Sequence, residues 1–332
     1  MVTIKDIARE SGYSVSTVSR VLNNRNDVSP DARKKIEEVV ASFNFVPNNN
    51  AKHLKQNNSK AIGVLVKGIS NMLFASIVEE IQRMIEKTEY TLVVSYLDED
   101  ADEVEQAILL CRERKPLGLL FLGGNPEYFH REFSGVDVPC VLVTNRANEM
   151  HFENLSSVAT DDIAAARCAV DQLFVAGHRR IGILGGDFDK SYTSHQRFLG
   201  CEQSFSEHGA VLDVEHCYEK ARFSFGSACR AMKRLIGKFP DVTAVFAMSD
   251  VMAIGAIRAL RDLGYRVPED VSVVGFDNYL YPGFPDLKIT SYEINTKAMV
   301  KVELDKALKQ IRGAASGKNM EIVSGQLVPK ES

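Results

Sequence analysis

A small apolar group, two short hydroxyls and one arginine gather on one face of a helix predicted near the N-terminus. The side chains on this face are Val15, Ser16, Ser19 and Arg20. In the major groove of DNA, hydroxyl and methyl groups can contact base edges, and arginine can contact guanine or phosphate. The face therefore favours binding to double-stranded DNA.

Two short helices joined by a tight turn would hold that face in place. The first helix has apolar residues at helical spacing, namely Ile4, Ile7 and Ala8. Thr3 can cap its free amides, and Gly12 can adopt the positive φ that the turn needs. Ser14 can cap the second helix, whose buried stripe consists of Val18, Val21 and Leu22. A helical hairpin that only packs against the rest of the chain would look the same, so this pattern alone leaves both interpretations open.

The order of residues in this segment separates the two interpretations. IKDIA, a glycine turn and SVSTVSRVLN follow one another over residues 4–23. This order closely resembles the DNA-reading headpiece of the lactose-repressor/galactose-repressor (LacI/GalR) family. The resemblance implies a helix-turn-helix headpiece over residues 1–46, with DNA contacts from Thr3, Ser14, Val15, Ser16, Ser19 and Arg20.

A third helix would complete the headpiece. Ser29 and Pro30 have the residue types of an N-cap and a first helical position. The apolar stripe expected after them is Ile36, Val39, Val40 and Phe43. Three helices that share their apolar stripes make a plausible minimal domain for about 45 residues.

Residues 47–60 are polar and rich in asparagine, which in isolation is typical of a flexible linker. However, Ala51 and Leu54 lie one helical turn apart, with Lys52 and Lys55 beside them. The family resemblance implies a hinge helix that forms only on DNA, where Leu54 wedges into the minor groove and kinks the duplex. Ala51, Leu54 and Lys55 are therefore further candidates for DNA binding. Many relatives have arginine in place of Lys52, and the phosphate contacts expected there differ accordingly.

From Ala61 onward, short apolar strands alternate with amphipathic helices, and the pattern restarts near Ser157. Such alternation predicts two parallel sheets wound by crossover helices, with a ligand cleft at the carboxyl ends of their strands. The resemblance extends over nearly the whole chain through GHRRIGILGG at 177–186, SDVMAIGAIRAL at 249–260 and VPEDVSVVGFDN at 267–278. It implies an α/β periplasmic-binding-protein-like effector domain that closes on its ligand by hinge motion. We expect two doubly wound subdomains, one of residues 61–158 and 289–319 and the other of residues 159–288 and 320–332.

Candidate ligand contacts lie near the predicted strand ends. The resemblance implies that Arg197 hydrogen-bonds ligand hydroxyls or carbonyls, and Asp277 could accept two hydrogen bonds from a diol. The structural alternatives are a surface ion pair for Arg197 and a turn cap for Asp277. Further candidates are Phe74 and Phe223 as apolar faces against a ring, and Thr193, Ser249 and Arg146 as polar contacts. Asp250 is expected to cap the helix that follows it rather than to contact ligand.

Two places in the sequence depart from the family pattern. Ile294 stands where many relatives have glutamine, and the usual Asp-Arg pair is offset near Asn145 and Arg146. The pocket is therefore not expected to match those of the lactose or purine sensors.

Composition limits the alternatives. The chain has 332 residues, of which 45% are hydrophobic and 25% charged, an ordinary balance for a soluble globular protein. We expect a cytoplasmic protein without a membrane segment, because no apolar run approaches about 20 residues and no secretory signal is evident. The six cysteines show no CxxC spacing, which favours reduced thiols over disulfides or a metal site.

Charge is unevenly distributed along the chain. Residues 1–60 hold ten Lys/Arg against six Asp/Glu, and the remainder holds thirty against thirty-eight. A basic head on an acidic body suits a polyanionic partner, although a solvated basic face would give the same small excess.

These observations predict a DNA-binding transcriptional regulator, expected to be a repressor, that is controlled by a small metabolite, with a sugar as the expected effector. A nucleobase or other non-sugar metabolite is the alternative effector. A homodimer on a near-palindromic operator is expected, since one recognition helix covers only a few base pairs. No leucine-heptad tail for tetramers follows the last predicted strand.

An enzyme and a pure solute-binding protein are the alternatives from other classes. The sequence has no G-x-S-x-G, G-x-x-x-x-G-K-[ST], GxGxxG or HExxH motif, and it predicts neither catalytic residues nor a cofactor. Periplasmic receptors carry an export signal and no headpiece, so the regulator remains the favoured interpretation.

Overall fold

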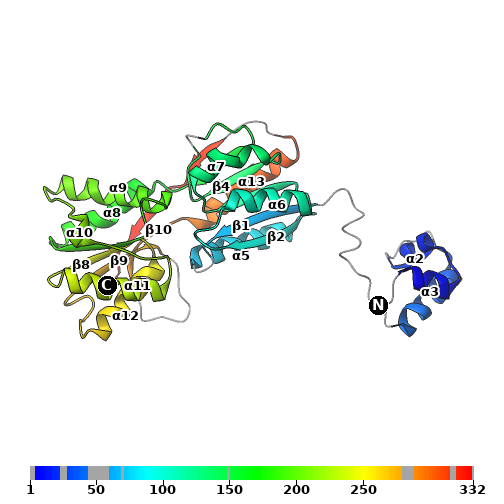
Figure 1. Ribbon diagram of the computed structural model, residues 1–332, viewed down its shortest axis with the longest axis horizontal. Helices are drawn as coiled ribbons and strands as arrows, with labels where there is room; N and C mark the ends of the chain where they lie inside the picture. Colours follow the sequence, from blue (N-terminus) through cyan, green and yellow to red (C-terminus); the bar gives the residue numbers. More distant parts are fainter. Residues whose placement is uncertain are drawn as a thin grey trace. The chain divides into compact units, whose positions relative to one another are not determined.

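A computed structural model of the chain describes residues 4–22, 28–43, 60–68, 71–147, 150–278, 288–314 and 319–330. The chain divides into two compact units, Met1–Ser59 and Lys60–Ser332. Figure 1 shows a small helical unit and a larger unit built from sheets and helices.

The first unit contains α1 (Ile4–Ser11), α2 (Val15–Leu22) and α3 (Pro30–Ser42). Its core consists of Ile7, Ala8, Val18, Val21 and Ile36, all buried. Gly12 has a φ of +76° in the turn between α1 and α2, as predicted. The predicted start of α3 is also confirmed, since Ser29 Oγ accepts a hydrogen bond from Ala32 N and Pro30 is the first helical residue.

One predicted core residue of this unit is not buried. Phe43 follows the last turn of α3 as its C-cap and is 40% exposed, whereas Val39 and Val40 are partly buried against the core. Because α3 ends at Ser42, Phe43 does not lie on the buried face of the helix, although it continues the apolar stripe in the sequence. Thr3, Ala51, Leu54 and Lys55 lie outside the described residues.

The second unit contains two six-stranded sheets. The first has the order β11-β5-β4-β3-β1-β2, and its neighbouring strands are all parallel. These strands are β1 (Ala61–Lys67), β2 (Thr91–Leu97), β3 (Gly118–Leu122), β4 (Cys140–Val143), β5 (Leu155–Ala159) and β11 (Met320–Ile322). The helices beside them are α5 (Met72–Ile85), α6 (Glu103–Arg114), α7 (Pro126–Glu132) and α13 (Thr296–Ile311), with a short 3-10 turn at Phe133–Gly135. We call this sheet and its helices the first lobe.

The second sheet has the order β12-β10-β9-β8-β6-β7, and only its β10–β12 pair is antiparallel among the described strands. Its strands are β6 (Ile181–Gly185), β7 (Tyr218–Lys220), β8 (Ala244–Ala247), β9 (Ser272–Asp277), β10 (Thr290–Glu293) and β12 (Gln326–Val328). Its helices are α8 (Asp162–Val175), α9 (Tyr192–Glu207), α10 (Val214–Cys217), α11 (Phe225–Lys238) and α12 (Asp250–Asp262). In this second lobe, α8 and α9 cover one face of the sheet, and α11 and α12 cover the other (Figure 1). The predicted pair of doubly wound, mainly parallel sheets is confirmed.

The chain passes between the lobes three times. The passages follow β5 at residues 160–161, β10 at 294–295 and β11 at 323–325. The predicted boundaries at 289 and 320 are wrong, because Thr290–Glu293 pairs with β9 and Met320–Ile322 pairs with β5. Each passage begins where a strand ends, whereas the prediction placed those two at the start of a strand.

Local signals explain how helices begin beside the strand ends. Asn71, Asp102, Asn125, Asp161, Ser191, Ser249 and Asn295 each accept a backbone N–H as an N-cap. Such caps stop the extended backbone and turn it into a helix at the carboxyl edge of each sheet. Among the described helices, none is both long and apolar enough to cross a bilayer.

Candidate functional site

The DNA-facing surface predicted on α2 is only partly described. Val15 is 39% exposed and Arg20 is exposed, while Val18 and Val21 on the opposite face are buried. Ser14 caps the helix, since Thr17 N donates to Ser14 Oγ over 3.2 Å. The side chains of Ser16 and Ser19 lie outside what the structure describes. An exposed valine and arginine on a short capped helix keep the predicted contact face accessible.

Arg197 lies in the second lobe, where α8, α9, β8 and β9 meet. Its side chain is 6% exposed, and its Nε donates to Asp162 Oδ1 over 2.8 Å. Its Nη1 donates to the carbonyl oxygen of Met248, just after β8. The guanidinium carbon lies 3.7 Å from the ring centroid of Phe276. Arg197 is thus a buried, oriented cation and not part of a surface ion pair.

Asp277 ends β9 close to this arginine and is 6% exposed. Its Oδ1 is buried and has no hydrogen-bond partner among the described residues. Burial raises the pKa of Asp277 well above its usual value; Arg197 opposes this shift, and Asp250 and Asp162 add to it. The site therefore contains a buried carboxyl oxygen that could bind a ligand hydroxyl.

Backbone strain marks the same edge in both lobes. Asp277 has a φ of 107° and Asn278 of 49°, directly at the end of β9. Thr144 has a φ of 75°, directly after β4 in the first lobe. Residues other than glycine adopt such values at a cost of about 1–3 kcal/mol each, and they concentrate at functional sites.

The N-cap of α12 is Ser249 and not Asp250 as predicted. Ser249 is the N-cap of α12, because its Oγ accepts from Met252 N over 3.3 Å. Asp250 is the first helical residue, and its Oδ1 accepts from Ser291 Oγ over 2.7 Å. Ser249 is fully buried, and its hydroxyl is engaged by the helix start.

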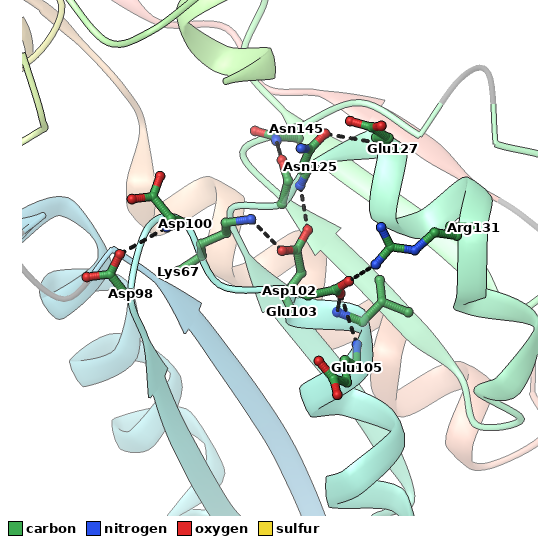
Figure 2. A network of polar contacts seen from close by, with 12 residues as sticks. Lys67, Asp98, Asp100, Asp102, Glu103, Glu105, Asn125, Glu127, Arg131 and Asn145 are labelled. Carbon is green, nitrogen blue, oxygen red and sulfur yellow. Dashed lines mark hydrogen bonds and ion pairs between the residues drawn. The ribbon is translucent and has the colours of Figure 1, made fainter. Parts of the chain in front are cut away.

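A polar network at the carboxyl edge of the first lobe was missed by the sequence analysis (Figure 2). Lys67 at the end of β1 donates to Glu103 Oε2 over 2.6 Å, and Asn125 N donates to Glu103 Oε1. Glu103 is 1% exposed, and burial raises its pKa against the opposing effect of Lys67. The Lys67 ammonium also lies 4.7 Å from the ring centroid of Tyr128. A lysine that ends an otherwise apolar strand was the signal for this network.

Asn145 and Thr193 connect the two lobes directly. Thr193 Oγ1 at the start of α9 donates to Asn145 Oδ1 over 2.9 Å. Asn145 Nδ2 donates to the carbonyl oxygen of Gly124, so the amide is oriented by its own lobe (Figure 2). The predicted candidate Thr193 therefore lies at the junction, and its partner Asn145 was not predicted as a site residue.

The remaining candidates differ in position. Arg146 pairs with Asp161 over 2.8 Å, at the first passage between the lobes. Phe74 is 7% exposed in the core of α5, where a Cβ on Gly123 would lie 3.2 Å from its ring. Phe223 is half-buried after β7, and a Cβ on Gly186 would lie 3.0 Å from its ring. Of the predicted ligand contacts, Arg197 and Asp277 therefore lie near each other. Phe74 lies in the core, and Arg146 forms an ion pair with Asp161 where the chain first passes between the lobes.

The six cysteines are free thiols in the structure. Among the described residues, no group of His, Cys, Asp or Glu side chains is arranged to hold a metal ion.

Comparisons with known proteins agree with this architecture. Residues 3–48 match the family described as bacterial regulatory proteins, lacI family, and residues 170–332 match a periplasmic binding protein-like domain. The HTH-type transcriptional regulator MalR of Clostridium butyricum is 35% identical over 332 residues, covering 99% of this chain and 98% of that protein. The ribose operon repressor of Haemophilus influenzae is 30% identical over 309 residues, covering 92% and 89%. A solved structure of a transcriptional regulator CelR-cellobiose complex has a TM-score of 0.72 at 26% identity and covers 100% of both chains.

Proposed function

This chain belongs to the lacI family of bacterial regulatory proteins and is a transcriptional regulator rather than an enzyme, and we propose that its effector is a small uncharged polyol, most simply a sugar. In this proposal the protein binds a near-palindromic operator as a homodimer. The effector occupies the edge where Arg197 and Asp277 meet and changes the affinity for DNA.

The observation that carries the proposal is that Arg197 and Asp277 are both buried and lie close enough for the arginine to affect the pKa of the acid. The guanidinium is fixed by Asp162 and by the Met248 carbonyl, and Asp277 keeps one buried oxygen without a partner in the described chain. A buried polar atom without a partner costs about 1–3 kcal/mol, and a ligand hydroxyl would remove that cost. Two adjacent hydroxyls suit this carboxyl group, which can accept two hydrogen bonds.

The balance of charge favours an uncharged ligand over an anionic one. Arg197 already pairs with Asp162 and Lys67 with Glu103, while Asp277 adds a further carboxyl group. A phosphate or carboxylate would have to displace one of these partners beside a buried acid. The relatives support the sugar class without naming one compound, since one is a ribose operon repressor and another structure contains cellobiose.

Control of DNA binding requires the effector to have different affinities for two arrangements of the protein. The three passages between the lobes are the segments about which such a change could turn. The headpiece would then respond through residues 47–60, where Leu54 is the proposed wedge in the minor groove.

Thermal unfolding of the full chain with single compounds tests the effector class. The panel consists of ribose, maltose and cellobiose, their phosphorylated forms, and hypoxanthine. At about 100 times its Kd a ligand adds about 2.7 kcal/mol of stability, which raises the Tm by several °C. We expect a neutral sugar to do so, and Arg197→Ala to abolish the shift while Arg234→Ala keeps it. A shift only with a phosphorylated sugar or with hypoxanthine would replace the proposed effector class.

A further inference from the structure

The edge strands β2 and β7 occupy matching positions in the two sheets, each beside the first strand of its lobe. Three consecutive acidic residues, Asp98, Glu99 and Asp100, follow β2. A single arginine, Arg222, follows β7 after one alanine. Opposite charges therefore stand at equivalent strand ends of the two lobes.

Arg222 pairs with all three acids across the boundary between the lobes. Its Nη2 lies 3.0 Å from Asp98 Oδ1 and also contacts Asp100, and its Nε lies 2.7 Å from Glu99 Oε1. The two segments are thus joined by the charges of one arginine and three carboxylates.

Both sides of this contact are held by their own lobe. Asp100 N donates to Asp98 Oδ1 over 3.1 Å, which folds the acidic loop beside Lys67 (Figure 2). Arg222 N donates to Ser227 Oγ over 3.0 Å, which ties the arginine to the start of α11. The contact therefore joins two locally ordered segments, and its opening would require the lobes to separate there.

We propose that Arg222 and the acidic triad Asp98, Glu99 and Asp100 form an ionic latch between the lobes. The latch does not depend on the proposed effector site. An exposed ion pair is usually weak and is screened by salt. Here, however, one cation faces three carboxylates, so its removal also leaves their mutual repulsion uncompensated.

Because the latch is made of charges, salt should weaken it. The lobes should separate at β2 and β7 more often as salt increases, even when no charged ligand is present. The Thr193–Asn145 hydrogen bond joins the lobes through uncharged groups and should not respond to salt in this way. Salt dependence therefore distinguishes the latch from the rest of the junction.

Hydrogen–deuterium exchange of the full chain without any effector tests this proposal. Peptides covering residues 94–103 and 219–227 are followed at about 0.1 M and about 1 M salt, where the Debye length falls from about 10 Å to about 3 Å. We expect several-fold faster exchange in both peptides at high salt, and the same increase at low salt in Arg222→Ala. Arg222→Lys keeps the charge and should remain close to the wild type.

Arg167→Ala is the matched control. Arg167 is 42% exposed, against 50% for Arg222, but it pairs with Glu207 inside the second lobe and away from both peptides. Equal exchange in Arg222→Ala and wild type, or an equal increase in Arg167→Ala, would overturn the latch. Because no effector is added, faster exchange in Arg222→Ala supports the latch even if no sugar binds.

Discussion

The buried carboxyl group of Asp277 has two opposing effects. Its burial lowers the stability of the folded protein, and its unpaired oxygen can accept a hydrogen bond from a ligand. Burial raises its pKa, so the folded chain holds this proton more tightly than the unfolded chain does. The stability that the proton contributes is fully present below the unfolded pKa of about 3.9 and is lost as the pH rises through the folded value. The destabilisation caused by this residue therefore increases as the pH rises above the unfolded pKa.

Replacing this acid by its uncharged isostere should separate the two effects. We expect Asp277→Asn to raise the Tm at pH 8 by a few °C relative to the wild type, and by less at pH 4. The same variant should no longer respond to the sugar that stabilises the wild type, because asparagine cannot accept at both of its terminal atoms. Calorimetry at the two pH values measures the first effect. A wild type and variant that differ equally at both pH values would contradict the assignment.

The sequence pointed to some site residues and not to others for a physical reason. Arg197 and Asp277 belong to motifs that resemble the family, so their positions could be carried over. Glu103 and Arg222 act through partners 36 and 124 positions away in the chain, Lys67 and Asp98 respectively. Such pairs form only when particular strand ends meet, and neither residue type nor spacing within one segment reveals them.

At the scale of elements, α8 and α9 carry the two partners of the ion pair beside the proposed effector site. Asp162 begins α8 and Arg197 lies in α9, so the distance between these helices sets the ion pair. Gly200 makes the close approach possible, since a Cβ there would lie 2.3 Å from the Ile163 carbonyl oxygen of α8. A side chain at Gly200 must push the two helices apart.

We therefore expect Gly200→Ala to reduce the free energy of unfolding by about 1–3 kcal/mol, as overpacking does, and to weaken effector binding. Urea denaturation and the thermal shift measure the two effects. Gly237→Ala on α11 is the control, because a Cβ there meets nothing within 4 Å. That variant should be neutral or slightly stabilising, by about 0.5–1 kcal/mol. If both variants behaved alike, close helix contact would not be the cause.

The elements themselves were largely predictable, and their boundaries less so. Alternating apolar strands and amphipathic helices indicated both sheets, since each buried strand has a continuous apolar run. The prediction placed residues 320–322 in the second lobe, whereas β11 pairs with β5 of the first. Three residues, Met320–Ile322, form too short a pattern to assign to a sheet, and their parallel pairing with β5 depends on an interaction distant in sequence.

At the scale of the whole molecule, the two compact units should be separable in function. Residues 60–332 contain both sheets and both Arg197 and Asp277 of the proposed effector site, while α2 lies in the other unit. We expect a fragment of residues 60–332 to keep the sugar-induced rise in Tm and to lose operator binding.

Fluorescence anisotropy with palindromic DNA selected by the full chain measures operator binding. In the full chain, Arg20→Ala should weaken this binding by about 1–3 kcal/mol if the arginine contacts a base, with no change in the sugar response. Binding that stayed equal for selected and scrambled DNA would contradict sequence-specific recognition. A fragment that no longer unfolds cooperatively would show instead that the units depend on each other.

The late return of the chain to the first lobe also affects how the protein is made. The first sheet is completed by α13 and β11, which come from residues 296–322, more than 130 residues after β5 ends. A ribosome adds about 5–20 residues each second, so the first lobe waits for roughly ten seconds or more while the second lobe is synthesised. During that interval the face of β3, β4 and β5 that α13 later covers is without its helix. Once β9 has been synthesised, the second lobe lacks only the short strands β10 and β12. We therefore expect the lobe that is translated second to fold first on the ribosome.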